Sequence, residues 1–250
     1  MRCLVPARPD TAAEDPDLER LYAYPPARPW LRANMVASLD GAATSSGRSG
    51  ELSDTADRRL FRVLRGLADV ILVGAATVRK EGYGAAKARP EFAEGRAERG
   101  QPPAPRLAVV SRTLDLDFTS SFFTASTRTT ILAPAAAPAD RLAAAREVAD
   151  VIIAGDEVVD VGRAVDALAG PGHERLLCEG GPHLLAQIVA AGRLDELCLT
   201  LSPRLTAGDA PRILAGQPEI VPPAQLRLDQ LLEQDGFLFA RYLLDTARSA

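Results

Sequence analysis

The sequence predicts an α/β fold in which a mainly parallel central sheet is flanked by helices and has antiparallel strands at its C-terminal edge. Two observations predict the parallel part. Strand and helix patterns alternate from Trp30 onward, and runs such as residues 70–73 and 151–153 are apolar throughout, as in strands covered on both faces. Three strand-like runs near the C-terminus are separated only by loops, which favours antiparallel pairing there.

Each element follows from a local pattern. Apolar residues at helical spacing, such as Leu60, Leu64 and Leu67, predict helices over residues 54–67, 75–81, 139–148 and 161–169 and from 182 onward. Apolar or alternating runs predict strands over 30–39, 68–74, 106–111, 129–133, 150–155, 176–178, 194–205, 224–234 and 236–245. The polar stretch 82–105 is expected to be a long loop.

One domain is expected over residues 30–250, preceded by an N-terminal extension over residues 1–29. The extension contains several prolines and an acidic stretch. Proline disfavours regular helix, so we expect only a short helix near residues 18–22, followed by an extended arm.

Composition restricts the function classes. The 250 residues are 47% hydrophobic, enough for a large core, and a formal charge of −4 gives no reason to expect a nucleic-acid partner. Three cysteines and two histidines lack the spacing of a disulfide framework or a metal site, so no bound metal is expected. No run of about 18 apolar residues occurs and the N-terminus does not resemble a signal peptide. We therefore expect a cytoplasmic protein without a membrane partner.

Candidate ligand-binding residues follow three of the expected strands, at the sheet edge where parallel sheets usually bind ligands. Gly74 ends one strand, and Thr77 lies in the next helical turn. The Gly180–Gly181 pair ends a second strand, before a helix whose first N–H groups have no partner within the helix. Ser111 and Arg112 follow a third strand.

Two glycine turns and an arginine are together what a phosphorylated dinucleotide needs, because backbone N–H groups bind a pyrophosphate and a cation binds an adenosine 2′-phosphate. Each turn alone is also explained by ordinary turn and capping geometry, and Arg112 alone by a solvated surface charge. No G-x-G-x-x-G motif follows a first strand, so a standard Rossmann half is not supported.

A polar residue interrupts the expected strand over residues 30–39. Asn34 shares a face with Val36, while Met35 and Ala37 lie on the other face, so Asn34 is expected to face a pocket. The strand ends at Asp40 before a glycine, a pair that also favours a tight hairpin turn. A Ser- and Gly-rich loop, "TSSGRSG", follows.

Five motifs, "NMVASLDGAA", "LRGLADVILVGAATV", "RLAVVSR", "EGGPHLL" and "RLDELCLTLSPRL", resemble in order and spacing the reductase domain of the bacterial riboflavin-biosynthesis deaminase–reductase. The resemblance covers residues 30–245. It implies a dihydrofolate-reductase-like fold, NADPH as hydride donor, a homodimer, and reduction of the ribosyl side chain of 5-amino-6-(5-phosphoribosylamino)uracil to the ribitylamino product. The H-x-E and P-C-x-x-C signature of the zinc deaminase does not occur, so the chain resembles a stand-alone reductase.

The patterns and the resemblance together assign candidate roles. Glu179, as polar anchor or proton relay beside the reacting sugar, and Glu81, which orients the substrate, are the expected catalytic residues. The expected substrate contacts are Asn34, Asp40, Ser49 and Arg65. The expected cofactor contacts are Ala37, Gly74, Thr77, Ser111, Arg112, Gly180, Gly181, Pro182, His183, Leu184 and Leu185.

Three departures from the family pattern bear on the substrate. Asn34 stands where many members have Lys, and Glu81 stands where they have Asp. The family segment DDPxL…R is replaced by "EGYGAAKARPE", so Lys87 or Arg89 would have to bind the substrate phosphate.

The sequence leaves two other functions open: reduction of a pteridine such as dihydrofolate on the same fold, and NADPH binding without catalysis. Two residue roles also stay open. Glu179 could be a carboxylate stabilised at a helix N-terminus, and Arg65 could be a surface ion-pair partner.

Overall fold

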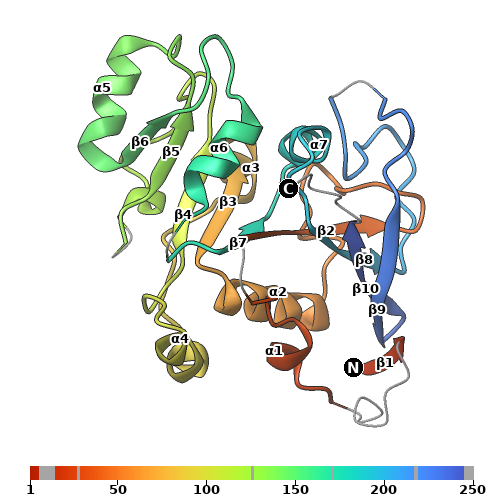
Figure 1. Cartoon of the computed structure of the whole chain (residues 1–250). Coiled ribbons are helices and arrows are strands. Elements are labelled where there is room, and N and C mark those ends of the chain that lie inside the picture. Colours follow the sequence, from red (N-terminus) through yellow and green to blue (C-terminus); the bar gives the residue numbers. More distant parts are fainter. Residues whose placement is uncertain (6–14, 27–28, 125–126, 171, 217–218, 245–250) are drawn as a thin grey trace.

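The computed structural model describes residues 1–250 except 6–14, 27–28, 125–126, 171, 217–218 and 245–250. Its strands are β1 (Arg2–Val5), β2 (Trp30–Ser38), β3 (Val70–Gly74), β4 (Arg106–Val110), β5 (Thr130–Ala133), β6 (Asp150–Ile153), β7 (Arg175–Cys178), β8 (Glu196–Ser202), β9 (Leu226–Gln234) and β10 (Phe237–Leu244). They form one ten-stranded sheet in the order β1-β9-β10-β8-β2-β7-β3-β4-β5-β6 (Figure 1).

The strands from β8 to β6 in this order pair in parallel, which confirms the predicted parallel sheet. β3 is buried on both faces, as its apolar sequence predicts. The same expectation for residues 151–153 is wrong, because β6 is the edge strand and Ile153 is 40% exposed. A strand's place in the sheet depends on its neighbours, which its own composition does not encode.

The C-terminal strands pair antiparallel, as predicted, with β10 between β8 and β9. The N-terminal arm adds a strand that the sequence analysis did not identify, since β1 pairs antiparallel with β9, with Cys3 opposite Leu232. The short helix predicted near residues 18–22 is present as α1 (Leu18–Leu21), and Tyr22 is fully buried. The described part of residues 1–29 thus packs on the rest of the chain, and the boundary at residue 29 stays a prediction.

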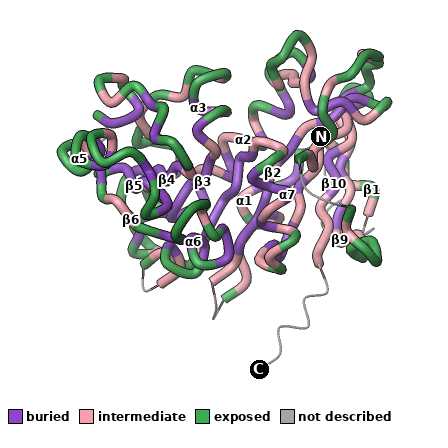
Figure 2. The backbone as a smooth tube through the Cα atoms, turned by 90° about the horizontal axis from the view of Figure 1, so that it is seen from above, coloured by how far each residue is buried: buried purple, intermediate pink, exposed green. Residues whose placement is uncertain are grey.

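Helices cover both faces of the sheet (Figure 1). The core on one face contains residues from α1, α2 (Thr55–Leu67), α3 (Ala75–Glu81) and α5 (Ala139–Val148), and the core on the other contains residues from α6 (Val161–Leu168) and α7 (Pro182–Ala190). The central strands are buried between these layers, whereas the exposed backbone lies mostly in the helices and loops around them (Figure 2). None of the described helices is long and apolar enough to cross a membrane.

The stretch 82–105 is not a plain loop, which corrects the sequence-based expectation. It contains a 3₁₀ turn (Pro90–Phe92) and α4 (Ala93–Glu98). Phe92 packs beneath Gly66 of α2, where an added Cβ would come within 2.6 Å of its ring. Arg96 donates to the Gly66 and Ala68 carbonyls at 3.0 and 2.8 Å. These long-range contacts stabilise a helix that local composition does not predict.

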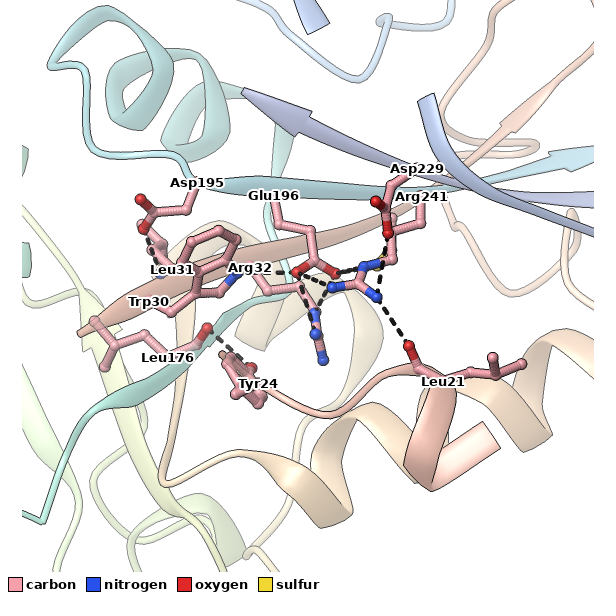
Figure 3. Close-up of polar contacts among 11 residues, drawn as sticks. Leu21, Tyr24, Trp30, Leu31, Arg32, Leu176, Asp195, Glu196, Asp229 and Arg241 are labelled. Atoms are coloured by element: carbon pink, nitrogen blue, oxygen red, sulfur yellow. Dashed lines mark hydrogen bonds and ion pairs between the residues drawn. The ribbon is translucent and has the colours of Figure 1, made fainter. Parts of the chain in front are cut away.

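A buried charge cluster joins β2, β8 and β10 (Figure 3). Glu196 accepts hydrogen bonds from Arg32 Nε at 2.6 Å, Arg241 Nε at 2.9 Å and Trp30 Nε1 at 2.9 Å. Burial alone would raise the pKa of Glu196, but the two guanidinium groups hold it below its ordinary value. Glu196 is therefore ionised at neutral pH. The stability that its ion pairs with Arg32 and Arg241 contribute is lost only when acid protonates the carboxyl.

The same cluster fixes the N-terminal arm to the sheet. Arg241 Nη1 donates to the Leu21 carbonyl at 2.8 Å, and the Tyr24 hydroxyl donates to the Leu176 carbonyl at 3.1 Å. The Arg32 guanidinium lies 4.1 Å from the centre of the Tyr24 ring, a cation–π contact. Figure 3 shows Trp30, Arg32 and Arg241 converging on Glu196, while Leu21 of the arm contacts Arg241 and Tyr24 contacts Leu176.

We predict that Glu196→Gln lowers the free energy of unfolding by about 3–5 kcal/mol, because it leaves the buried Arg32 guanidinium without a carboxylate and Arg241 with only Asp229 at 3.5 Å. The matched control is Glu233→Gln, which breaks an ion pair whose Arg2 side chain is 71% exposed and should leave the free energy of unfolding nearly unchanged. Urea unfolding followed by circular dichroism measures both. Equal losses for the two variants would contradict the structural role given to Glu196.

Candidate active site

A cavity of about 470 Å³ lies where β2, β3 and β7 end, between α2 and the N-terminus of α7; we call it the central cavity. The parallel strands bring their carboxyl ends to one edge of the sheet, so residues far apart in sequence meet there. It is lined by Asn34, Met35, Val36, Ala43, Thr44, Gly47, Ser49, Gly50, Ser53, Asp57, Arg58, Phe61, Gly74, Ala76, Thr77, Lys80, Glu81, Tyr83, Glu179, Gly181, Pro182, His183, Leu184 and Pro211.

The strongest polar contact at the cavity joins two predicted site residues. Arg65 Nε and Nη2 donate to Glu179 Oε1 and Oε2, both at 2.6 Å, which is a bidentate ion pair between α2 and the end of β7. The Tyr83 hydroxyl donates to Glu179 Oε2 at 2.8 Å. The Glu179 side chain is only 1% exposed, so these partners compensate a carboxylate that is almost removed from bulk water.

Burial and charge set the protonation states around this carboxylate. Burial opposes the charge on Arg65, but Glu179 outweighs it, so the pKa of the guanidinium lies above its ordinary value. Burial, and next the Glu179 charge, raise the pKa of the Tyr83 hydroxyl well above its ordinary value. Arg65 therefore stays charged and Tyr83 stays a hydrogen-bond donor toward Glu179.

A second predicted pair lies on the neighbouring wall. Glu81 Oε1, at the end of α3, accepts hydrogen bonds from the Ser49 N–H at 2.9 Å and from the Ser49 hydroxyl at 3.0 Å. The contact fixes the Ser- and Gly-rich loop against α3. Ser49 and Glu81 are thus brought together as expected for residues of one site.

A second cavity of about 530 Å³, the outer cavity, adjoins the central one. Residues Ser49, Phe61, Glu81 and Tyr83 line both cavities. Basic side chains are concentrated on the outer side, where the lining includes Arg65, Lys87, Arg89 and Arg96. The two cavities together offer a mixed polar and apolar space with a cationic end, which suits a small molecule that carries an anionic group at one end.

The predicted cofactor turns pack against each other. The Gly74 N–H donates to the Gly180 carbonyl at 2.8 Å, and a Cβ on Gly181 would lie 2.7 Å from the Thr77 hydroxyl. The peptide between Gly180 and Gly181 is cis. Gly181 is the N-cap of α7, and no side chain caps the first turn of this helix, so its N–H groups are available to an anionic group.

Asn34 lines the central cavity, as predicted, together with Met35 and Val36. The Asn34 Oδ1 atom is buried and has no hydrogen-bond partner in the structure. Met35, on the opposite face, contacts the glycine turn, since a Cβ on Gly180 would lie 3.1 Å from its sulfur. An unpaired buried acceptor is costly, so Asn34 is suited to receive a donor from a ligand.

Several predicted site residues do not line the central cavity. Ala37 is buried in β2, and the buried Ser111 hydroxyl accepts the Leu114 N–H at 3.0 Å. Arg112 is exposed beyond the end of β4. Their assignment as cofactor contacts stays a prediction, although the end of β4 lies beside that of β3 at the same sheet edge.

Asp40 and Leu185 have other contacts. Asp40 accepts hydrogen bonds from the Ser38 hydroxyl and the Ala207 N–H, and the first of these contributes most to lowering the pKa of Asp40 to about 2. It holds the turn that follows β8, and its geometry does not support substrate binding. Leu185 lines an apolar cavity of about 690 Å³ behind α7, which we call the rear cavity.

Sequence reasoning missed several residues of the central cavity, among them Tyr83, Asp57 and Phe61. Tyr83 lies in the segment that departs from the family pattern, so no motif indicated it. Asp57 and Phe61 carried a usable signal, because they stand eight and four residues before Arg65 in α2 and so share a helix face with it.

Fold and site together define a class: an α/β protein that binds a small molecule between the carboxyl ends of parallel strands, a carboxylate–guanidinium pair and a helix N-terminus. Within this class the chain belongs to the RibD C-terminal domain family, whose model matches residues 29–235.

Two curated relatives are named 2,5-diamino-6-ribosylamino-4(3H)-pyrimidinone 5′-phosphate reductases. The protein from Archaeoglobus fulgidus is 28% identical over 76% of this chain and 88% of its own length, and that from Methanothermobacter thermautotrophicus is 29% identical over 76% and 85%. A solved pyrimidine reductase-like protein from Corynebacterium diphtheriae superposes with a TM-score of 0.81 at 29% identity, covering 91% of this chain and 98% of the other. The predicted family is thereby confirmed.

We predict that Gly181→Ala weakens NADPH binding by about tenfold or more, because the added Cβ displaces the turn that presents the first N–H groups of α7. Gly170→Ala is the control, since nothing lies within 4 Å of an added Cβ there. Fluorescence titration with NADPH measures both affinities. Unchanged binding by the Gly181 variant would remove the glycine turn from the cofactor site.

Proposed function

We propose that this protein is a cytoplasmic, NADPH-dependent reductase of riboflavin biosynthesis that reduces the ribosyl side chain of a 5-amino-6-ribosylaminopyrimidine 5′-phosphate to the ribityl form. The observation that carries the proposal is the buried Glu179 carboxylate, held by Arg65 and Tyr83 on the cavity wall beside the glycine turn. Membership of the RibD C-terminal domain family and the reductase names of both curated relatives support it.

The cofactor end of the central cavity fits a phosphorylated dinucleotide. Gly74, Gly181 and Thr77 form a cradle that a Cβ on Gly181 would fill, and the uncapped first turn of α7 offers N–H donors near His183 and Leu184. When bound, NADPH supplies the hydride. The chain's task is to hold the nicotinamide against the sugar carbon that receives the hydride and to exclude water.

The substrate end fits a sugar phosphate. Lys87 and Arg89 line the outer cavity and provide positive charge for the phosphate in place of the family's usual arginine, whereas the charge of Arg65 is balanced by Glu179. The resemblance of the sequence implied the uracil form of the substrate, whereas both curated relatives are named for the diaminopyrimidinone form. The two molecules differ at C2 of the base and share the ribosyl phosphate that these side chains would bind.

Glu179 and the side chains around it on the cavity wall are suited to assist ring opening and reduction. The aminoribose ring must open to an imine before hydride addition at C1′, which requires a proton at the ring oxygen. Glu179, which has about one acceptor position left beside Arg65 and Tyr83, takes the proton from the amine N–H at C1′ and returns it to the ring oxygen, with Arg65 stabilising its charge and Tyr83 holding its orientation. Glu81, fixed by Ser49, orients the sugar phosphate between the two cavities.

The proposal is tested by NADPH oxidation at 340 nm with each aminopyrimidine ribosyl phosphate, with its dephosphorylated form, and with dihydrofolate. Turnover of a phosphorylated pyrimidine supports the proposed function. Turnover of dihydrofolate alone would support the pteridine alternative, and NADPH binding without any turnover would support a non-catalytic role.

We predict that Glu179→Gln lowers kcat by about 100-fold or more, since the amide neither relays a proton nor balances Arg65, while the Kd for NADPH changes little. Stopped-flow absorbance and NADPH titration measure the two quantities. Glu174→Gln, an exposed position before β7, is the control and should retain full activity. Unchanged turnover in Glu179→Gln would exclude the carboxylate from the mechanism.

We also predict a homodimer. Among the described residues, β1 pairs with positions 231 to 233 of β9, so the first half of β9 lies at an open sheet edge, next to the rear cavity lined by Leu226 and Leu244. Open strand edges invite pairing with another chain. Light scattering should give twice the mass of the chain at micromolar concentration, and a single-chain mass would refute the prediction.

A further inference from the structure

We propose that Asp57 binds the 2-amino edge of the substrate's base, so that the enzyme reduces the 2,5-diaminopyrimidinone form in preference to the uracil form. The inference rests on the proposed function and adds to it the residue that selects the base. It also orders the chemistry, because reduction of the sugar would then come before the reaction that removes the 2-amino group.

Asp57 lies in the first turn of α2, is 8% exposed and lines the central cavity. Its Oδ1 accepts the Thr200 hydroxyl at 2.7 Å, and its Oδ2 accepts the Ser53 hydroxyl at 2.5 Å. Burial raises the pKa of Asp57, and the two hydroxyl donors partly oppose the rise. Thr200 on β8 and Ser53 before α2 hold the carboxylate from two sides, so its orientation is fixed before a ligand binds.

The hydrogen-bonding capacity of Asp57 matches a pair of donors. A carboxylate has about four lone-pair positions, and the two hydroxyls occupy one on each oxygen. One position per oxygen is left. Two parallel N–H donors satisfy such an arrangement best, as a guanidinium does with a carboxylate.

The two candidate bases differ in this respect. The diaminopyrimidinone presents N3–H and the 2-amino group side by side, which is a two-donor edge for Asp57. In the uracil form a carbonyl oxygen replaces the 2-amino group and stands between N1–H and N3–H. If the Asp57 carboxylate faced C2 of the uracil, its oxygens would lie against the C2 carbonyl oxygen. Both groups are hydrogen-bond acceptors, so this contact is unfavourable in a buried site.

The face of α2 gives the spacing from base to phosphate. Asp57, Phe61 and Arg65 stand at intervals of four residues, so they form one stripe about 12 Å long at 1.5 Å per residue. Asp57 lines the central cavity, Phe61 lines both cavities, and Arg65 lines the outer cavity. The Arg65 guanidinium lies 4.4 Å from the centre of the Phe61 ring. The stripe thus runs from Asp57, at the end proposed for the base, to Arg65 in the outer cavity, where Lys87 and Arg89 offer positive charge to the phosphate.

Asn34 supplies an independent observation. It lies on the same face of the sheet as Thr200, because Asn34 pairs with Cys198 and Val36 pairs with Thr200 in the β2–β8 register. Its buried Oδ1 has no partner. The floor of the cavity therefore presents acceptors from both Asp57 and Asn34, which favours the base that carries more amino donors.

The test compares kcat/KM for the two ribosyl phosphates, which differ only at C2. We expect the wild-type protein to prefer the 2-amino substrate by about 10- to 100-fold, as for a bidentate contact that distinguishes two bases. Asp57→Asn presents an NH₂ donor in place of one acceptor and should bring the ratio near one or below it. Asp54→Asn is the matched control, because Asp54 caps α2 without lining the cavity and asparagine caps equally well.

The outcomes separate this inference from the proposed function. A wild-type preference for the uracil substrate, or an unchanged ratio in Asp57→Asn, would overturn the inference and leave the reductase function standing. Failure to reduce either substrate would overturn the proposed function itself. A purely structural role for Asp57 would lower both kcat/KM values in proportion and keep their ratio. If Asp57→Asn fails to fold, the wild-type ratio still tests the inference, because a preference for the uracil substrate overturns it. Thr200→Val then tests the role of Asp57: it keeps the charge of Asp57 but loosens its orientation, and it should lower the ratio part of the way.

Discussion

The bidentate pair between Arg65 and Glu179 is the constraint on which the site depends. It joins α2 to the end of β7 across 114 positions of sequence, and it closes the wall between the central and outer cavities. A carboxylate that is almost fully buried needs such a partner, because desolvation without compensation would cost several kcal/mol. The same contact that stabilises this charge also places it beside the glycine turn, so stability and function share one pair of side chains.

Stability and function are otherwise separated along β2 and β8. Near the N-terminal ends of the two strands, Arg32 and Glu196 form the buried charge cluster that fixes the N-terminal arm. Two to four residues later, Asn34 and Thr200 lie at the central cavity, with polar atoms directed to Asp57 or left unpaired. One face of two paired strands thus changes from a cluster of paired charges to a stretch where the buried Asn34 Oδ1 has no partner and lies at the cavity, which is where a ligand is expected.

Much of the fold could be predicted from sequence because it depends on local patterns. Apolar runs indicated the central strands, and helical spacing indicated α2, α5 and α6. Two predictions failed for long-range reasons: α4 depends on Phe92 and Arg96 contacting α2, and β6 lies at an edge that its apolar sequence does not reveal. Of the candidate site, Glu179, Arg65 and Gly181 were indicated by motifs, whereas Asp57 and Tyr83 were not.

By itself, the sequence determined the fold class, the family and the strand ends that carry the site, since these follow from residue order and periodicity. Only the tertiary structure decided which side chains meet. Arg65 contacts Glu179 and not a surface acid, Asp40 holds a turn, and Asp57 reaches Thr200 on a strand 143 positions away. The physical reason is that partners across a sheet are selected by strand order and register, which no single segment specifies.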